Sequence, residues 1–174
     1  MQTYSRRPSA VSRFELSAAA LHIIAMALML MDHLWATLLP AQDWLTCAGR
    51  LAFPLYCFLL VEGFLHTHSL RQYAGRMLAF ALVSELPFDL AFFHTLIYRG
   101  HQNVFWTLFF GLCALGCLRH CGERSAPGIF SALALAVLAE LLRTDYGAIG
   151  VLLIVVLYIT RASRPLQCLF GAVA

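Results

Sequence analysis

With 61% hydrophobic and 12% charged side chains, this chain of 174 residues is too apolar for a water-soluble domain, which is about half apolar and about a quarter charged. Its net charge is only +3, and no nucleic-acid partner is expected. The apolar residues form several blocks of about 15–24 residues, close to the roughly 20 that cross a hydrocarbon core. The composition therefore predicts an all-α, polytopic bundle of transmembrane helices whose surroundings are the lipid bilayer.

The blocks predict a single transmembrane domain with six spans. Residues 1–16 are expected to form an arm, residues 17–165 the six-helix core, and residues 166–174 a partial C-terminal helix. The spans are expected at about 17–39, 50–65, 75–93, 104–118, 127–142 and 148–160. No CxxC pair occurs among the six cysteines, so neither a disulfide framework nor a metal site is expected.

The arginines predict how the bundle is oriented. If the N-terminus is cytoplasmic, nine of the twelve arginines fall on the cytoplasmic side of these spans and three on the other side. The positive-inside rule favours this arrangement, so a cytoplasmic N-terminus is expected.

An acid and an imidazole stand side by side in the first span, at Asp32 and His33. An ionised Asp at mid-membrane depth costs about 2.5–3.5 kcal/mol on insertion scales, so a purely structural helix would do better with two apolar residues. The default interpretation of such a pair is a functional site with partners on other helices.

Four spans deliver ionisable or polar groups to the outer half of the membrane in this orientation. These groups are Asp32, His33, Arg50, Glu85, Asp89, His101, Gln102, Asn103, Glu140, Arg143, Asp145 and Tyr146. We expect them to meet in one buried polar cavity. The alternative is a set of separate ion pairs that lock helices together.

Two further groups lie toward the cytoplasmic side. His22 precedes His33 by eleven residues, which is three helical turns or about 16 Å, so both face the same way. The two histidines either line a path from the cytoplasm to the outer site, or His22 is an interfacial residue without a role. Glu62 and His66 form either a local pair or part of an inner binding site.

The residue types in the outer group fit acid–base chemistry. A histidine beside carboxylates in a low-dielectric site can act as a general base near neutral pH. Arg50 could hold an anionic group or a developing oxyanion. The chain has no nucleophile elbow, Gly-rich phosphate loop or HExxH run, which favours direct transfer promoted by a histidine base over a covalent Ser intermediate.

Several segments taken together resemble the TraX family of bacterial integral-membrane proteins, which is linked to conjugation and to acetylation of the pilin N-terminus. The segments are MLMDHLWATLLP, GRLAFPLYCFLLVEGFLHT, ALVSELPFDLAF, HQNVFWTL and DYGAIGVLLI, in the family's order and spacing. The resemblance implies membrane acyl transfer, a location in the bacterial inner membrane and acetyl-CoA as donor.

The resemblance also implies site residues. The wider class of membrane acyltransferases places a basic residue eleven positions before a His on the first helix, and these positions match His22 and His33. The other implied positions are Asp32, Arg50, Glu62, Glu85, Asp89, His101, Gln102, Asn103, Asp145 and Tyr146.

The leading hypothesis is thus an inner-membrane acetyltransferase that uses acetyl-CoA and no metal. His33 would be the base, Asp32 or Asp89 would orient it, and Arg50 or Asn103 would stabilise the oxyanion. His22, Glu62, Glu85, His101, Gln102, Asp145 and Tyr146 would bind the donor or the acceptor, which is a pilin or another membrane-associated molecule such as a surface glycan. The alternatives are a small proton-coupled transporter and a non-catalytic membrane protein of the same family.

Overall fold

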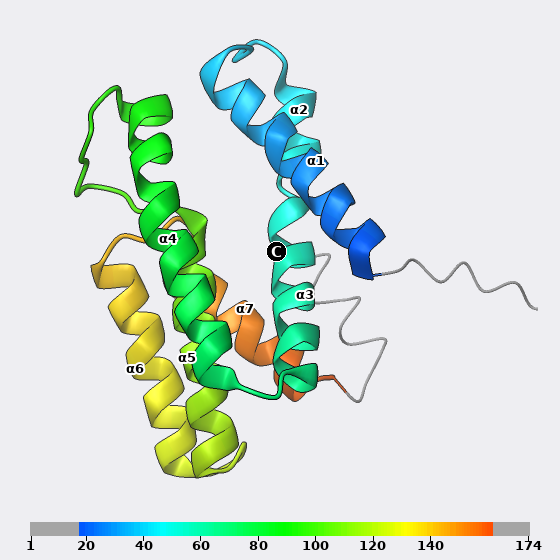
Figure 1. Ribbon diagram of the computed structural model, residues 1–174, viewed down its shortest axis with the longest axis vertical. Helices are drawn as coiled ribbons and strands as arrows, with labels where there is room; N and C mark the ends of the chain where they lie inside the picture. The colour runs from blue at the N-terminus through cyan, green and yellow to red at the C-terminus, as the bar shows by residue number, and fades with distance from the viewer. Residues whose placement is uncertain (1–17, 162–174) are drawn as a thin grey trace, which may run out of the picture.

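The computed structural model describes residues 18–161, which form a bundle of helices (Figure 1). The helices are α1 (Ala18–Thr37), α2 (Asp43–Gly49), α3 (Ala52–His66), α4 (Leu70–Phe93), α5 (Val104–Cys121), α6 (Ala126–Leu141) and α7 (Gly147–Ile159). Within this range there is no β-strand, and one isolated bridge joins Gln102 to Thr144. The predicted all-helical membrane bundle is confirmed. The predicted arm at 1–16 and the partial helix at 166–174 lie outside the described residues.

Between residues 18 and 161, three segments are long and apolar enough to cross a membrane: α1, the stretch Asp43–His66 that contains α2 and α3, and α5. Helices α6 and α7 are apolar but shorter. The chain is therefore a membrane protein. The expected loop before residue 50 is wrong, because residues 43–49 form the short helix α2.

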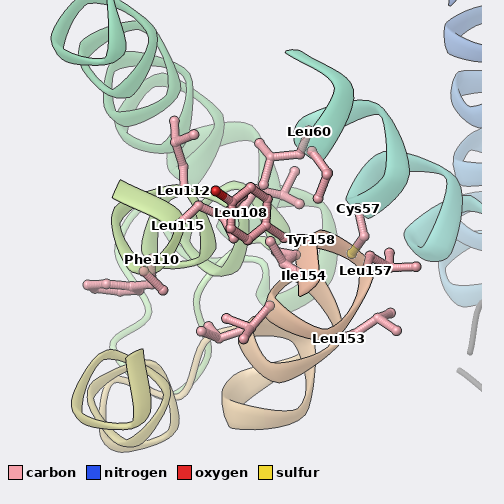
Figure 2. Packing of buried hydrophobic residues seen from close by; sticks show 14 of the residues in the cluster. Cys57, Leu60, Leu108, Phe110, Leu112, Leu115, Leu153, Ile154, Leu157 and Tyr158 are labelled. Atoms are coloured by element: carbon pink, nitrogen blue, oxygen red, sulfur yellow. The ribbon is translucent and has the colours of Figure 1, made fainter. Parts of the chain in front are cut away.

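The core lies where α3, α5 and α7 meet. Figure 2 shows side chains from these three helices converging, among them Leu60, Leu112 and Ile154, which are at most 3% exposed. Helix α6 contributes small residues instead: its buried positions are Gly128, Ala132, Ala136 and Ala139. Small residues let helix backbones approach closely in lipid, where apolar burial gives little driving force.

Helix α1 lies at the edge of the bundle (Figure 1). Of its twenty residues, all of them described, Ala25 is the only buried one. It packs on α2 and α3 and makes few contacts with α4. Most of its surface is therefore left uncovered by the other described helices.

We call one end of the bundle, at the bottom of Figure 1, the arginine end, because Arg71, Arg76, Arg119, Arg124 and Arg161 lie there. At this end Arg161 forms a 2.5 Å ion pair with Glu123, which also accepts a hydrogen bond from Tyr158. The hydrogen bond from Arg161 holds the pKa of Glu123 below its ordinary value. This pairing ties the turn between α5 and α6 to the end of α7. The loops before α2, α5 and α7 lie at the opposite end.

Candidate functional site

A cavity of about 260 Å³ lies near the end of the bundle opposite the arginine end, between α1, the start of α3, α4 and the start of α5. Most of its wall is apolar, including Phe53, Phe88 and Phe92. Its polar lining residues come from α1, α4, the start of α5 and the loop before α7. They are Asp32, His33, Ser84, Asn103, Asp145 and Tyr146. Five of the twelve residues predicted for the site thus face one hollow.

Asp32 is held in place by α2. The Thr46 hydroxyl donates a 2.8 Å hydrogen bond to Asp32 Oδ1. Beside it the helices nearly touch, because a Cβ built on Gly49 would lie 2.5 Å from Asp32 Cβ and 2.9 Å from its Cα. Sequence reasoning missed both Thr46 and Gly49, since a threonine and a glycine in an expected loop carry no signal for a contact fourteen or more residues away.

His33 lines the cavity. Its ring packs edge to face against Phe92, with centroids 5.2 Å apart and planes at 73°. Among residues 18–161, no hydrogen bond or ion pair involves either ring nitrogen. A ring without internal partners is free to exchange a proton with a bound molecule.

The expected orienting acids do not pair with His33. The Asp32 carboxylate is bonded to Thr46. Asp89 is 1% exposed, and its Oδ2 accepts a 2.7 Å hydrogen bond from the backbone N–H of Tyr98. Asp89 therefore anchors the loop after α4 and is absent from the cavity wall, so its predicted role beside His33 is wrong.

Asn103 is a junction between α4 and α5. Its Oδ1 accepts from the N–H of Phe105, which caps α5. Its Nδ2 donates to the Ala81 carbonyl at 2.8 Å and to Glu85 Oε2. Both amide hydrogens are therefore used inside the protein, which contradicts the expectation that Asn103 donates to an oxyanion.

Glu85 does not line the cavity but bonds to Asn103, which does. The same carboxylate oxygen that meets Asn103 also accepts a 3.0 Å hydrogen bond from Trp106 Nε1. Its other oxygen, Oε1, is buried without a partner among the described residues. Glu85 thus positions a cavity residue from behind, and Trp106 is a further member of this network that the sequence did not reveal.

The loop before α7 brings Tyr146 and Asp145 to the cavity. The Tyr146 ring stacks on Phe53 with centroids 3.5 Å apart and planes at 2°. Two buried threonines fix the loop behind it: Thr107 Oγ1 donates to Thr144 Oγ1 at 2.9 Å and accepts from the Tyr146 N–H at 3.4 Å. The phenol is thereby held at a defined place on the cavity wall.

Arg50, at the C-terminal end of α2, acts on the same phenol. Tyr146 lies in the loop before α7, and burial raises its pKa to about 12. The negative charges of Asp145 and Asp32 raise this pKa further, whereas the positive charge of Arg50 lowers it. Arg50 is exposed and does not line the cavity itself, so it reaches the site through Tyr146.

His101 and Gln102 join two loops at this end. His101 Nε2 lies 3.2 Å from Asp145 Oδ1, and the Gln102 N–H donates to the Arg143 carbonyl at 3.0 Å. The hydrogen bond with Asp145 raises the pKa of His101. Neither residue lines the cavity. They fasten the loop before α5 to the loop before α7, and so hold Asp145 at the cavity rim.

Two further predicted residues, His22 and Glu62, do not line this cavity. His22 bonds to the Ala18 carbonyl at 2.8 Å and lines a second pocket of about 400 Å³ near the arginine end. Glu62 and His66 form the local pair considered above, with 3.8 Å between the side chains. The two pockets share Phe105, so His22 and His33 face neighbouring hollows along the same side of α1.

Comparison with known proteins identifies the family of the chain. A family profile described as "TraX protein" matches residues 17–170. The chain belongs to the TraX family. It is 32% identical over 139 residues to Protein TraX of Escherichia coli, covering 78% of this chain and 52% of that protein. It is 36% identical over 118 residues to the probable fimbrial assembly protein FimC, serogroup H1, of Dichelobacter nodosus, covering 58% of this chain and 46% of that protein.

This TraX-family chain spans about half the length of these two relatives. No solved structure matches it. Across residues 18–161, no cluster of three or more His, Cys, Asp or Glu side chains could hold a metal ion.

Proposed function

We propose that this TraX-family protein is a membrane acyltransferase that moves an acetyl group from acetyl-CoA to an acceptor such as a pilin N-terminus or a surface glycan. The observation that carries the proposal is the His33 ring, whose nitrogens have no hydrogen-bond partner among residues 18–161 and which shares a cavity with Asp32, Asp145 and Tyr146. The link to pilin is supported by the relatives, one of which is described as a probable fimbrial assembly protein.

In the proposed reaction His33 is the general base. It removes the proton from the acceptor amine or hydroxyl as the acceptor's lone pair adds to the thioester carbonyl. The tetrahedral oxyanion is stabilised by the Tyr146 phenol, with the positive charge of Arg50 nearby. Collapse of this intermediate breaks the C–S bond, and the departing thiolate of coenzyme A takes the proton back from His33. Asp32 and Asp145 line the same cavity as the ring that holds the proton between these steps.

The direction of approach follows from the arginines. We place the protein in the bacterial inner membrane with a cytoplasmic N-terminus, so that the arginine end faces the cytoplasm. Acetyl-CoA, a polyanion of the cytoplasm, would then approach from the arginine end. The acceptor would reach the His33 cavity from the opposite end or from the bilayer.

The test follows label from acetyl-CoA into an acceptor peptide or glycan with membranes that contain the protein. His33→Gln should lower the transfer rate by about 10²–10⁴-fold, the usual contribution of a general base. The matched control is His120→Gln, an exposed histidine in the last turn of α5 that touches neither cavity. Equal transfer by both variants would remove the proposal.

A second function, proton-coupled transport, is favoured by one observation. Asp89 is almost wholly buried within α4, and its Oδ1 has no partner among the described residues. Buried intramembrane acids of this kind are typical of proton relays. Flux of a solute into proteoliposomes without an acyl donor, abolished by Asp89→Asn, would support transport, and an acyltransferase should show no such flux.

A further inference from the structure

The second pocket, of about 400 Å³, lies in the half of the bundle nearer the arginine end. Side chains of α1, α3, α4 and α5 line it. Its wall is mostly apolar, with Met26, Leu59, Leu60, Met77, Phe80 and Leu108. The polar lining groups are His22, Arg76 and two phenols, and no carboxylate belongs to the wall that the described residues form.

The pocket exists because α1 and α4 do not close on each other. Helix α1 packs on α2 and α3, makes few contacts with α4 and buries only Ala25 among its twenty described residues. In Figure 1 the two helices flank α3. An apolar hollow between two lipid-facing helices can be filled by a hydrocarbon chain that enters from the bilayer.

The two ends of the pocket differ in chemistry. At one end Phe80 and Phe105 stack, with centroids 6.0 Å apart, and Phe105 is the wall shared with the His33 cavity. Nearer the arginine end stands Arg76, whose guanidinium lies 5.9 Å from the centre of the Tyr73 ring. Arg76 is exposed and forms no ion pair with any residue in the range 18–161.

We propose that this pocket binds a phospholipid with an anionic headgroup. The phosphate contacts Arg76, which can meet two of its oxygens at once. One acyl chain runs along the apolar wall and ends at the Phe80–Phe105 pair. The uncompensated charge of Arg76 selects anionic over zwitterionic headgroups. This lipid fills the gap between α1 and α4, and its binding is independent of the acyl-transfer proposal.

The experiment uses the full chain in nanodiscs that contain a trace of phosphatidylglycerol with a photoactivatable acyl chain. The crosslinked fraction is measured and the crosslinked residues are located by mass spectrometry. We expect crosslinks on the pocket wall, and we expect the same probe with a phosphatidylcholine headgroup to give several-fold fewer. Crosslinks scattered evenly over the lipid-facing surface, or equal labelling by the two headgroups, would overturn the proposal.

Two pairs of variants sharpen the test. Arg76→Gln should weaken labelling by about tenfold, the scale of one hydrogen bond to a charged group. Arg71→Gln, which removes the same charge from the same helix away from the pocket, should leave labelling unchanged. Met26→Trp should block the pocket from α1, whereas Ile23→Trp, on an exposed part of α1 outside the pocket, should not. Equal effects within either pair would contradict the proposal.

Competition with acetyl-CoA is the last part of the test. If excess acetyl-CoA removes the lipid from the pocket, the hollow belongs to the acyl donor and the lipid proposal is wrong. If labelling persists while His33-dependent transfer proceeds, the lipid and the donor occupy separate places.

Discussion

Replacing Gly49 by alanine should disturb the candidate site through the contact between α1 and α2. A Cβ at position 49 would lie 2.5 Å from Asp32 Cβ and 2.9 Å from both Asp32 N and Cα. These are backbone and near-backbone atoms, so no side-chain rotation relieves the clash. Ordinary contact between carbon atoms is about 3.5–4.0 Å, so α1 must move away by about 1 Å. Such overpacking costs about 1–3 kcal/mol.

The displacement falls on the helix that carries His33, and a 1 Å misplacement can reduce a rate by about 10²-fold. We therefore expect Gly49→Ala to lower both the midpoint of thermal unfolding and the rate of the proposed acetyl transfer. The matched control is Gly75→Ala in α4, where an added Cβ meets nothing within 4 Å. That change should be neutral or should stabilise the helix by up to about 1 kcal/mol. If the Gly49 variant behaves like the Gly75 variant, the packing argument is wrong.

Two further changes test the hydrogen bonds around the cavity. Thr46→Val keeps the side-chain shape but removes the hydrogen bond to Asp32, so the free energy of unfolding should fall by about 1 kcal/mol and transfer should slow. A variant with unchanged transfer would show that Asp32 needs no support. The hydrogen bond to Asp145 raises the pKa of His101 in the folded protein above its value in the unfolded chain. Protonated His101 therefore stabilises the fold fully at a pH below the ordinary histidine pKa, and this stabilisation is lost as pH rises through the raised pKa. When the midpoint of thermal unfolding is measured against pH, His101→Gln should lack this pH-dependent stabilisation. An unaltered pH profile would contradict the prediction.

The sequence predicts the helices well because the apolar blocks are long, and it predicts their ends less well. The third span was expected from residue 75, but α4 begins at Leu70. Its first turn is polar, and the Ser69 side chain caps it by accepting from the Gln72 N–H at 3.4 Å. Helix α2 was missed because seven residues that begin with an acid resemble a loop more than a span.

The sequence predicts the site only from the depth in the membrane that is expected for each polar residue. Asp32, His33, Asp145 and Tyr146 line one cavity, as their shared depth indicated. Depth does not say which way a helix is rotated, so the sequence could not show that Asp89 turns from the cavity to the Tyr98 backbone.

The helix that presents His33 has little protein around it, since nineteen of its twenty residues are at least partly exposed. Its tilt must then respond to bilayer thickness and lateral pressure as well as to its neighbours, because a loosely held span adjusts to the local hydrocarbon depth. Turnover measured in short-chain detergent and in membranes of matched thickness is therefore expected to differ even when the fold is intact. The surrounding lipid is in this sense expected to help set the geometry of the proposed site.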